Sequence, residues 1–126
     1  MTIKTILAPL TGSNAEKSVL NTALAIAKRF DAHIDVLHTR TDPRDAIPYL
    51  GEGISGAMIE EIMQRADAEI AEIENKAHHQ FETWRNDATL ALSDTPGEGA
   101  SCSWHVVTGA PDQATAVGAR YNDLVV

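Results

Sequence analysis

The sequence predicts an α/β domain built on an open parallel sheet with helices on both faces, of the Rossmann-like class. Three observations support this. Short apolar runs alternate along the chain with amphipathic helical patterns. The 126 residues suffice for one hydrophobic core. Aromatic residues make up only 5% of the chain, so the core must rest on aliphatic side chains, as in helices packed on a sheet.

The first half of the chain predicts a strand, a helix and a second strand. Residues 3–10 are almost continuously apolar, as in a strand covered on both faces. An amphipathic helix follows, because Ser13 and Glu16 form a capping box at its start. Residues 33–39 predict the second strand, and several glycines and prolines mark residues 40–56 as a loop.

A long helix is predicted from about residue 57 to residue 86, and its periodicity is the strongest in the chain. Residues 87–101 predict a polar connection with turn chemistry. The apolar positions of the long helix recur every three or four residues and predict one buried stripe: Met58, Ile62, Ala66, Ile70, Ile73, Ala77, Phe81 and Trp84.

The last quarter of the chain predicts a strand, a short helix and a further strand. Residues 102–108 form the third predicted strand. Pro111 begins the helix, and residues 123–126 begin the fourth strand. The helix is expected to bury a stripe made of Ala114, Val117 and Tyr121.

This element order predicts one domain over residues 1–126, with four parallel strands joined by right-handed crossovers. The chain stops at Val126 inside an apolar run, which predicts a domain that is incomplete at its C-terminal end. The fourth strand would then be an open edge with unpaired amides. We therefore expect self-association, with a homodimer as the simplest form.

Charge and composition narrow the classes of partner. The net charge is −8 and the isoelectric point is near 4.9, so general binding to nucleic acid is not expected. No apolar run in the sequence is long enough to cross a membrane. A single cysteine, Cys102, and the lack of a secretory signal favour the cytoplasm.

The turn after the first strand is the candidate binding site. Ligands of open parallel sheets sit beyond the carboxyl ends of the strands, where the strand order reverses. Gly12 would let the backbone approach a ligand, and the helix beginning at Ser13 would present free amides. The alternative is that Gly12 only makes a tight turn and Ser13 only caps the helix.

Three segments resemble the universal stress protein family. The segment IKTILAPLTGSNAEKSVLNTALAIAKRF is similar to the family's opening strand and helix, and HIDVLHT is similar to its second strand. The segment VVTGAPDQATAVGARYNDLVV resembles the unit before the family's glycine-rich loop. The resemblance implies five strands in the complete domain, of which four are present here. It also implies a cytoplasmic, often dimeric protein of stress physiology.

The resemblance implies ATP as the candidate cofactor, since many members bind it and others do not. In the binders, an aspartate in the first turn meets the nucleoside, and the backbone just after the second-strand histidine meets adenine. Thr11 stands here in place of that aspartate, and no counterpart of the phosphate loop precedes the end at Val126. The implied binding positions are Pro9, Leu10, Thr11, Gly12, Ser13 and Thr39.

No catalytic or metal site is predicted. His78 and His79 are neighbours on a helix and point about 100° apart. His38 and His105 lie on strands expected to be adjacent, but further metal ligands are not apparent. Cys102 has no basic partner nearby in the sequence and predicts a buried thiol.

Three functions remain open from the sequence. The first is a nucleotide-responsive stress protein that binds ATP. The second is a dimerisation or protein-interaction module of the same fold that binds no nucleotide, which Thr11 favours. The third is a hydrolase or transferase, which would need a base or metal ligand that the sequence does not offer. Fold alone does not choose among them.

Overall fold

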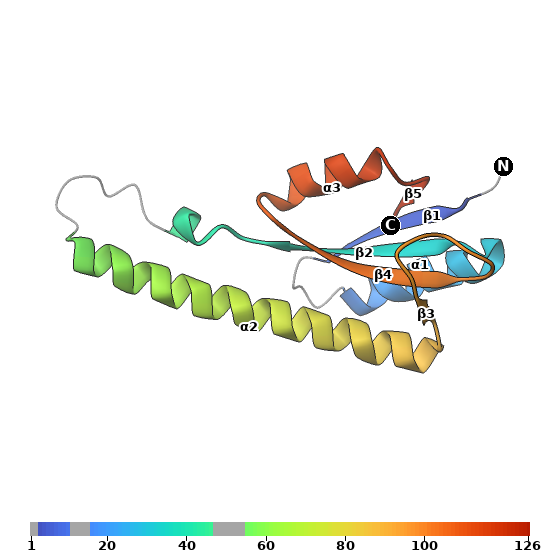
Figure 1. The fold of residues 1–126 in the computed structure, drawn as a ribbon, viewed down its shortest axis with the longest axis horizontal. Helices are drawn as coiled ribbons and strands as arrows, with labels where there is room; N and C mark the ends of the chain where they lie inside the picture. Colours follow the sequence, from blue (N-terminus) through green and yellow to red (C-terminus); the bar gives the residue numbers. More distant parts are fainter. Residues whose placement is uncertain (1–2, 11–15, 47–54) are drawn as a thin grey trace.

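The computed structural model describes residues 3–10, 16–46 and 55–126. Its centre is one sheet of five parallel strands in the order β3-β4-β2-β1-β5, shown in Figure 1. The strands are β1 (Thr5–Leu10), β2 (His33–Arg40), β3 (Ala91–Leu92), β4 (Ser101–Thr108) and β5 (Leu124–Val125). The predicted open parallel sheet is confirmed.

The predicted count of four strands was wrong, because β3 lies within the expected polar connection. The chain leaves the long helix, buries Leu90, and then pairs Ala91 with Ser101 and Leu92 with Cys102. The backbone N–H of Ser93 also donates to the carbonyl of Cys102 at 2.9 Å. Both residues of β3 are exposed, so no apolar pattern revealed this strand.

Helices cover both faces of the sheet (Figure 1). The helices α1 (Glu16–Phe30) and α2 (Gly56–Ala88) lie on one face, and α3 (Pro111–Ala119) lies on the other. A short 3₁₀ helix, η1 (Pro43–Ala46), follows β2. The arrangement follows from right-handed crossovers, which change faces when the chain reverses its direction across the sheet.

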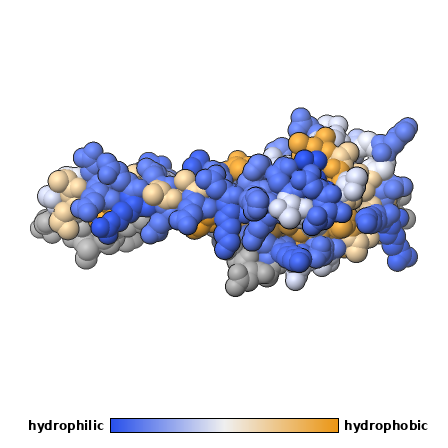
Figure 2. Space-filling view, turned by 90° about the horizontal axis from the view of Figure 1, so that it is seen from below, coloured by the Kyte–Doolittle hydropathy of each residue, from blue (hydrophilic) through white to orange (hydrophobic). Residues whose placement is uncertain are grey.

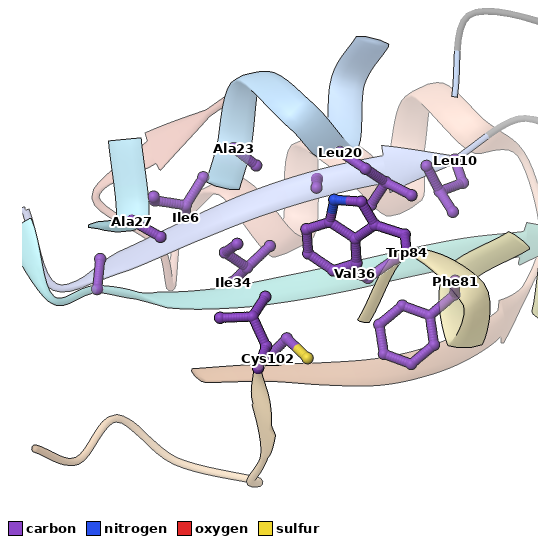
Figure 3. Close-up of a cluster of buried hydrophobic side chains, with 13 residues drawn as sticks. Ile6, Leu10, Leu20, Ala23, Ala27, Ile34, Val36, Phe81, Trp84 and Cys102 are labelled. Atoms are coloured by element: carbon purple, nitrogen blue, oxygen red, sulfur yellow. The ribbon is translucent and has the colours of Figure 1, made fainter. Parts of the chain in front are cut away.

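The hydrophobic core lies between the sheet and the α1–α2 layer. Alternate residues of β1 and β2 point into it, and Phe81 and Trp84 of α2 fill its centre (Figure 3). Cys102 contributes from β4 and is fully buried. The fully buried aliphatic members are Ile6, Ala8, Ala23, Ala27, Ala32, Ile34 and Val36, with Leu10 and Leu20 nearly so.

The α2 stripe is buried only in part, which corrects the prediction. A helix of 33 residues is about 50 Å long, whereas the eight residues of β2 span about 26 Å. The first half of α2 therefore projects past the strands (Figure 1). Met58 and Ile73 are 53% and 48% exposed, while Phe81 and Trp84 are buried. Figure 2 shows this projecting part as mostly hydrophilic on the viewed side.

The predicted buried stripe of α3 is also wrong. Val117 and Tyr121 are 56% and 81% exposed, and Ala114 is half-buried. The helix meets the sheet through Gly118 instead, where an added Cβ would lie 3.0 Å from Cδ2 of Leu7. The absence of a side chain at Gly118 allows this close approach of α3 to β1, while Val117 and Tyr121 remain exposed.

Candidate functional site

The carboxyl ends of β1, β2 and β4 lie together at one edge of the sheet. Leu10 is paired with His38, and Thr39 is paired with Val107 on the other side of β2. The structure thus brings together three of the six predicted positions, Pro9, Leu10 and Thr39. The other three, Thr11, Gly12 and Ser13, lie outside the described residues.

The strand order reverses at β1, which makes its carboxyl end the switch point of the sheet. The chain moves from β1 to β2 and β4 on one side and then returns to β5 on the other. In open α/β sheets, ligands bind in the crevice outside the strand ends at such a point. The order of the strands thus reverses at β1, the strand that precedes the predicted turn. The site at that turn stays a prediction.

The three described positions differ in what they expose. Leu10 is 1% exposed and belongs to the core, so its side chain is not available to a ligand. Pro9 and Thr39 are half-buried. Thr39 alternates with His38 along β2, so its side chain faces the α3 side of the sheet. Of these three positions, Pro9 and Thr39 can contribute their side chains and Leu10 only its backbone to a strand-end site.

A cavity of about 460 Å³ lies between α3 and the sheet. Thr39 is not one of its lining residues, but it pairs with Val107, which is. Its wall includes Leu37, Val107 and the segment from Thr108 to Ala110, which leads from β4 into α3. The N–H of Gly109 donates to the carbonyl of Arg40 at 3.0 Å, which fastens this segment to the end of β2. The cavity has a size typical of small-molecule sites.

One cation stands at the end of β2. Nε of Arg40 lies 3.8 Å from Oε1 of Glu74, and the Arg40 side chain is 41% exposed. This long and partly solvated ion pair is weak. Arg40 can therefore exchange Glu74 for an incoming anion at little cost, and it is placed one residue beyond Thr39.

His38 is a buried residue behind this edge. Among the described residues, its Nδ1 has no hydrogen-bond partner. The ring stacks on Trp104 with centroids 5.8 Å apart. Burial lowers the pKa of His38, although Glu74 and Glu16 act in the opposite direction. The imidazole is therefore held neutral.

A polar network lies at the opposite end of β2 and was not predicted. Nδ1 of His33 lies 2.7 Å from Oγ of Ser101, and Nε2 lies 3.0 Å from Oγ of Ser103. Asp35 accepts from Ser103 at 3.4 Å and lies 3.5 Å from Nε2 of His105. The network joins β2 to β4. Alternating serines on one strand opposite a histidine are its only sequence signal.

The structure separates His38 from His105. Their strands are adjacent, as expected, but His38 is paired with Val106 and His105 with Leu37. Because neighbouring residues of a strand point to opposite faces, the two rings lie on opposite sides of the sheet. Within residues 3–10, 16–46 and 55–126, no cluster of three metal-ligating side chains occurs.

The thiol of Cys102 is buried, in agreement with the sequence. Its side chain is fully inaccessible, and burial raises its pKa to about 11. A protonated thiol without access to solvent is a poor nucleophile. Among the described helices, none is long and apolar enough to cross a membrane.

The model of the universal stress protein family matches residues 2–126. The universal stress protein UspA of Lactobacillus plantarum is 19% identical with a TM-score of 0.61, over 100% of this chain and 77% of that one. The protein MJ0577 is 16% identical with a TM-score of 0.62, over 99% and 73%.

A universal stress protein solved in complex with cAMP is 15% identical, with a TM-score of 0.53 over 99% of this chain and 75% of that one. No curated protein matches the chain. The sheet order and the switch point at β1 define an open α/β protein of the Rossmann-like class. The match over residues 2–126 then places the chain in the universal stress protein family.

Proposed function

We propose that this chain binds an adenine nucleotide at the carboxyl ends of β1 and β2 and acts as a nucleotide-responsive protein of the stress response in the cytoplasm. The observation that carries the proposal is the meeting of Pro9, Leu10 and Thr39 at the switch point. A structural neighbour in complex with cAMP supports the choice of an adenine ligand.

Each described group has a role in this proposal. The backbone after His38, at Thr39, meets the base, and the half-buried Pro9 borders it. Arg40 leaves its long contact with Glu74 to meet phosphate charge. The sequence adds residues 11–13 to the proposed site, where Thr11 and Ser13 supply hydroxyls in place of a carboxylate.

The proposed role is binding rather than catalysis. A general base must reach its proton within hydrogen-bond distance. His38 is the described imidazole nearest to the edge in sequence, and it is 2% exposed and stacked on Trp104. A nucleotide at this edge would therefore change the conformation or partners of the protein through its contacts.

Thr11→Asp tests the nucleotide site. The change supplies a carboxylate that can accept from both ribose hydroxyls, so ATP should bind about tenfold more tightly than to the unaltered chain. Thr11→Asn is the matched control, because it has similar size without the charge, and it should give a smaller gain. Calorimetric titration with ATP and cAMP measures each affinity.

Two results would reject this proposal. If neither ATP nor cAMP binds to the unaltered chain or to Thr11→Asp, the proposed site does not exist. Equal affinities for Thr11→Asp and Thr11→Asn would show that the ribose does not lie at residue 11. Arg40→Gln gives an independent check, because it should weaken ATP more than adenosine if Arg40 meets phosphate.

A second candidate function is self-association as an interaction module, and exposed apolar side chains favour it. Val117, Tyr121 and Val125 are 56%, 81% and 39% exposed. They lie on α3, on the link after it and on β5, which Figure 1 shows next to each other. β5 is also an edge of the sheet. A second copy of the chain could therefore cover both the exposed apolar side chains and this open edge.

Sedimentation velocity tests this candidate. Tyr121→Glu should convert a dimer to a monomer, because it places a charge in the proposed interface. Gln64→Glu adds the same charge on the exposed side of α2 and should leave the dimer intact. A monomer at all concentrations of the unaltered chain would rule the candidate out.

A further inference from the structure

A groove between α1 and α2 has no part in the strand-end site. Its volume is about 500 Å³, which falls within the range of about 300–1,000 Å³ typical of small-molecule sites. In the part of the chain that the structure describes, the lining residues belong to these two helices and do not include Pro9, Leu10 or Thr39. The groove is therefore a separate cavity on the helical side of the sheet.

The floor of the groove is apolar. Leu20 and Trp84 line it and are 1% and 8% exposed, and Figure 3 shows both beneath α1. Leu24 and Ala88 also line it and are half-buried. On the viewed side of Figure 2, hydrophobic surface occurs in patches among hydrophilic atoms. The hydrocarbon part of a ligand on this floor would be removed from contact with water, which favours binding.

The two ends of the groove differ in charge. Both helices return the chain from the carboxyl ends of the strands, so they run in the same direction (Figure 1). Lys17 of α1 and His79 of α2 therefore line one end. Lys28 and Asp87 line the other end, about 16 Å along α1. Among the described residues that line the groove, the one acidic side chain is Asp87, at the second end.

The lysines are available to a ligand. Lys17 and Lys28 are exposed, and within the described ranges neither has an ion-pair partner. The Lys17 end is thus a local cationic region on a chain whose net charge is −8. At the other end, Asp87 offsets Lys28 and would repel an anion.

We propose that this groove binds an amphipathic monocarboxylate, with its carboxylate beside Lys17 and its hydrocarbon body over Leu24 and Trp84. The apolar floor favours a hydrocarbon body, and the cationic end favours an anionic head. A small anion without a hydrocarbon body would gain only an exposed ion pair, which is weak. A hydrocarbon with a cationic head would meet Lys17 with like charge.

Octanoate is the probe, titrated into the full chain by calorimetry. It should bind saturably with one site per chain. Butyrate lacks most of the apolar body, and octylammonium reverses the head charge. Both should bind at least about tenfold more weakly than octanoate. Trp84 forms part of the floor, so its emission should change on binding, and Trp104→Phe should retain that change.

Three variants locate the ligand within the groove. Lys17→Gln should weaken octanoate by about fivefold or more, whereas Lys28→Gln should change its affinity by less than about twofold. Leu24→Ser should also weaken it, because it makes the floor polar. Thermal melting by circular dichroism confirms that each variant is folded.

Clear outcomes would overturn the proposal. Absence of saturable octanoate binding to the unaltered chain would remove the site. Equal binding of octylammonium would show that Lys17 does not select an anion. A larger loss from Lys28→Gln than from Lys17→Gln would contradict the placement of the head. ATP titrated into Lys17→Gln keeps this test separate from the strand-end site, whose affinity should not change.

Discussion

His33 and His38 are both buried on β2, but their rings are held in different ways. Both nitrogens of His33 lie within hydrogen-bond distance of serine hydroxyls on β4. His38 is stacked on Trp104, and its Nδ1 has no partner in the described part of the chain. Adjacent strands thus place one imidazole in a polar network and the other against an aromatic ring.

Stability should fall as the pH drops below the ordinary histidine pKa of 6.5. Burial is the main cause that lowers the pKa of both His33 and His38 in the folded state. The two histidines therefore bind protons more readily in the unfolded chain than in the folded one. The stability that they contribute is complete above pH 6.5 and declines below it. Urea unfolding at about pH 7.5 and 5.5 measures the change, which cannot exceed about 1.4 kcal/mol per pH unit for each histidine.

Variants identify the groups responsible for this pH dependence. His33→Gln and His38→Gln should each reduce the loss of stability between the two pH values, whatever they cost at pH 7.5. The change in the free energy of unfolding between the two pH values is the relevant quantity, because each substitution also changes packing. If this change is the same in both variants as in the unaltered chain, other groups cause the loss of stability at low pH.

At the scale of elements, the end of α2 carries backbone strain. Thr89 caps the helix in the left-handed region with φ 55°, which a β-branched residue adopts at a cost. Its N–H donates to the carbonyl of Asn86 at 3.2 Å, and the N–H of Leu90 donates to that of Arg85. The turn that follows buries Leu90 and directs the chain into β3.

Thr89→Gly should stabilise the fold by about 1 kcal/mol, because glycine adopts this conformation without strain. Ala68→Gly is the control within the same helix, at an exposed position with helical backbone. It should destabilise by about 1 kcal/mol. Chemical unfolding of both variants checks the prediction, and a loss of stability in Thr89→Gly would contradict it.

Gly118→Val tests the close contact of α3 with β1. The new side chain would meet Leu7, which lies 3.0 Å from the position of an added Cβ. We expect a loss of about 1–3 kcal/mol from overpacking. Ala116→Val lies two residues earlier on an exposed part of α3 and should cost only about 0.5 kcal/mol of helix propensity. Thermal melts compare the two, and equal losses would show that Gly118 is not a contact.

At the scale of the whole molecule, one carboxylate joins the two ends of the described chain. Oδ2 of Asp123 accepts from the N–H groups of Lys4 at 2.8 Å and Thr5 at 3.2 Å. The segment before β5 is thereby fixed beside the start of β1. The surface that includes Tyr121 and Val125 is held in place by this contact.

Any dimer through that surface should be favoured by salt. Each copy carries a net charge of −8, so two copies repel each other at long range. Raising the salt concentration from about 0.05 to 0.3 M shortens the screening length and weakens this repulsion. Sedimentation at both concentrations should show tighter association at high salt. Weaker association at high salt would instead indicate an interface held by ion pairs.

The sequence identified the class of fold and most elements, because strand and helix periodicities are local properties. It failed at β3, whose two residues are both exposed, at Val117 of α3 and at Tyr121 in the link after α3. Periodicity shows that a helix has an apolar stripe but not whether another element covers it. At Gly118, a residue without a side chain, α3 approaches Leu7 of β1 closely.

By itself, the sequence determined the class of fold and the order of the longer strands and helices, since both follow from patterns within short segments. The strand-end site stays a prediction. Only the tertiary structure decided which distant groups meet. It placed His33 between Ser101 and Ser103, separated His38 from His105, and formed the α1–α2 groove. The physical reason is that strand register and helix approach depend on packing across the whole core, which no local pattern records.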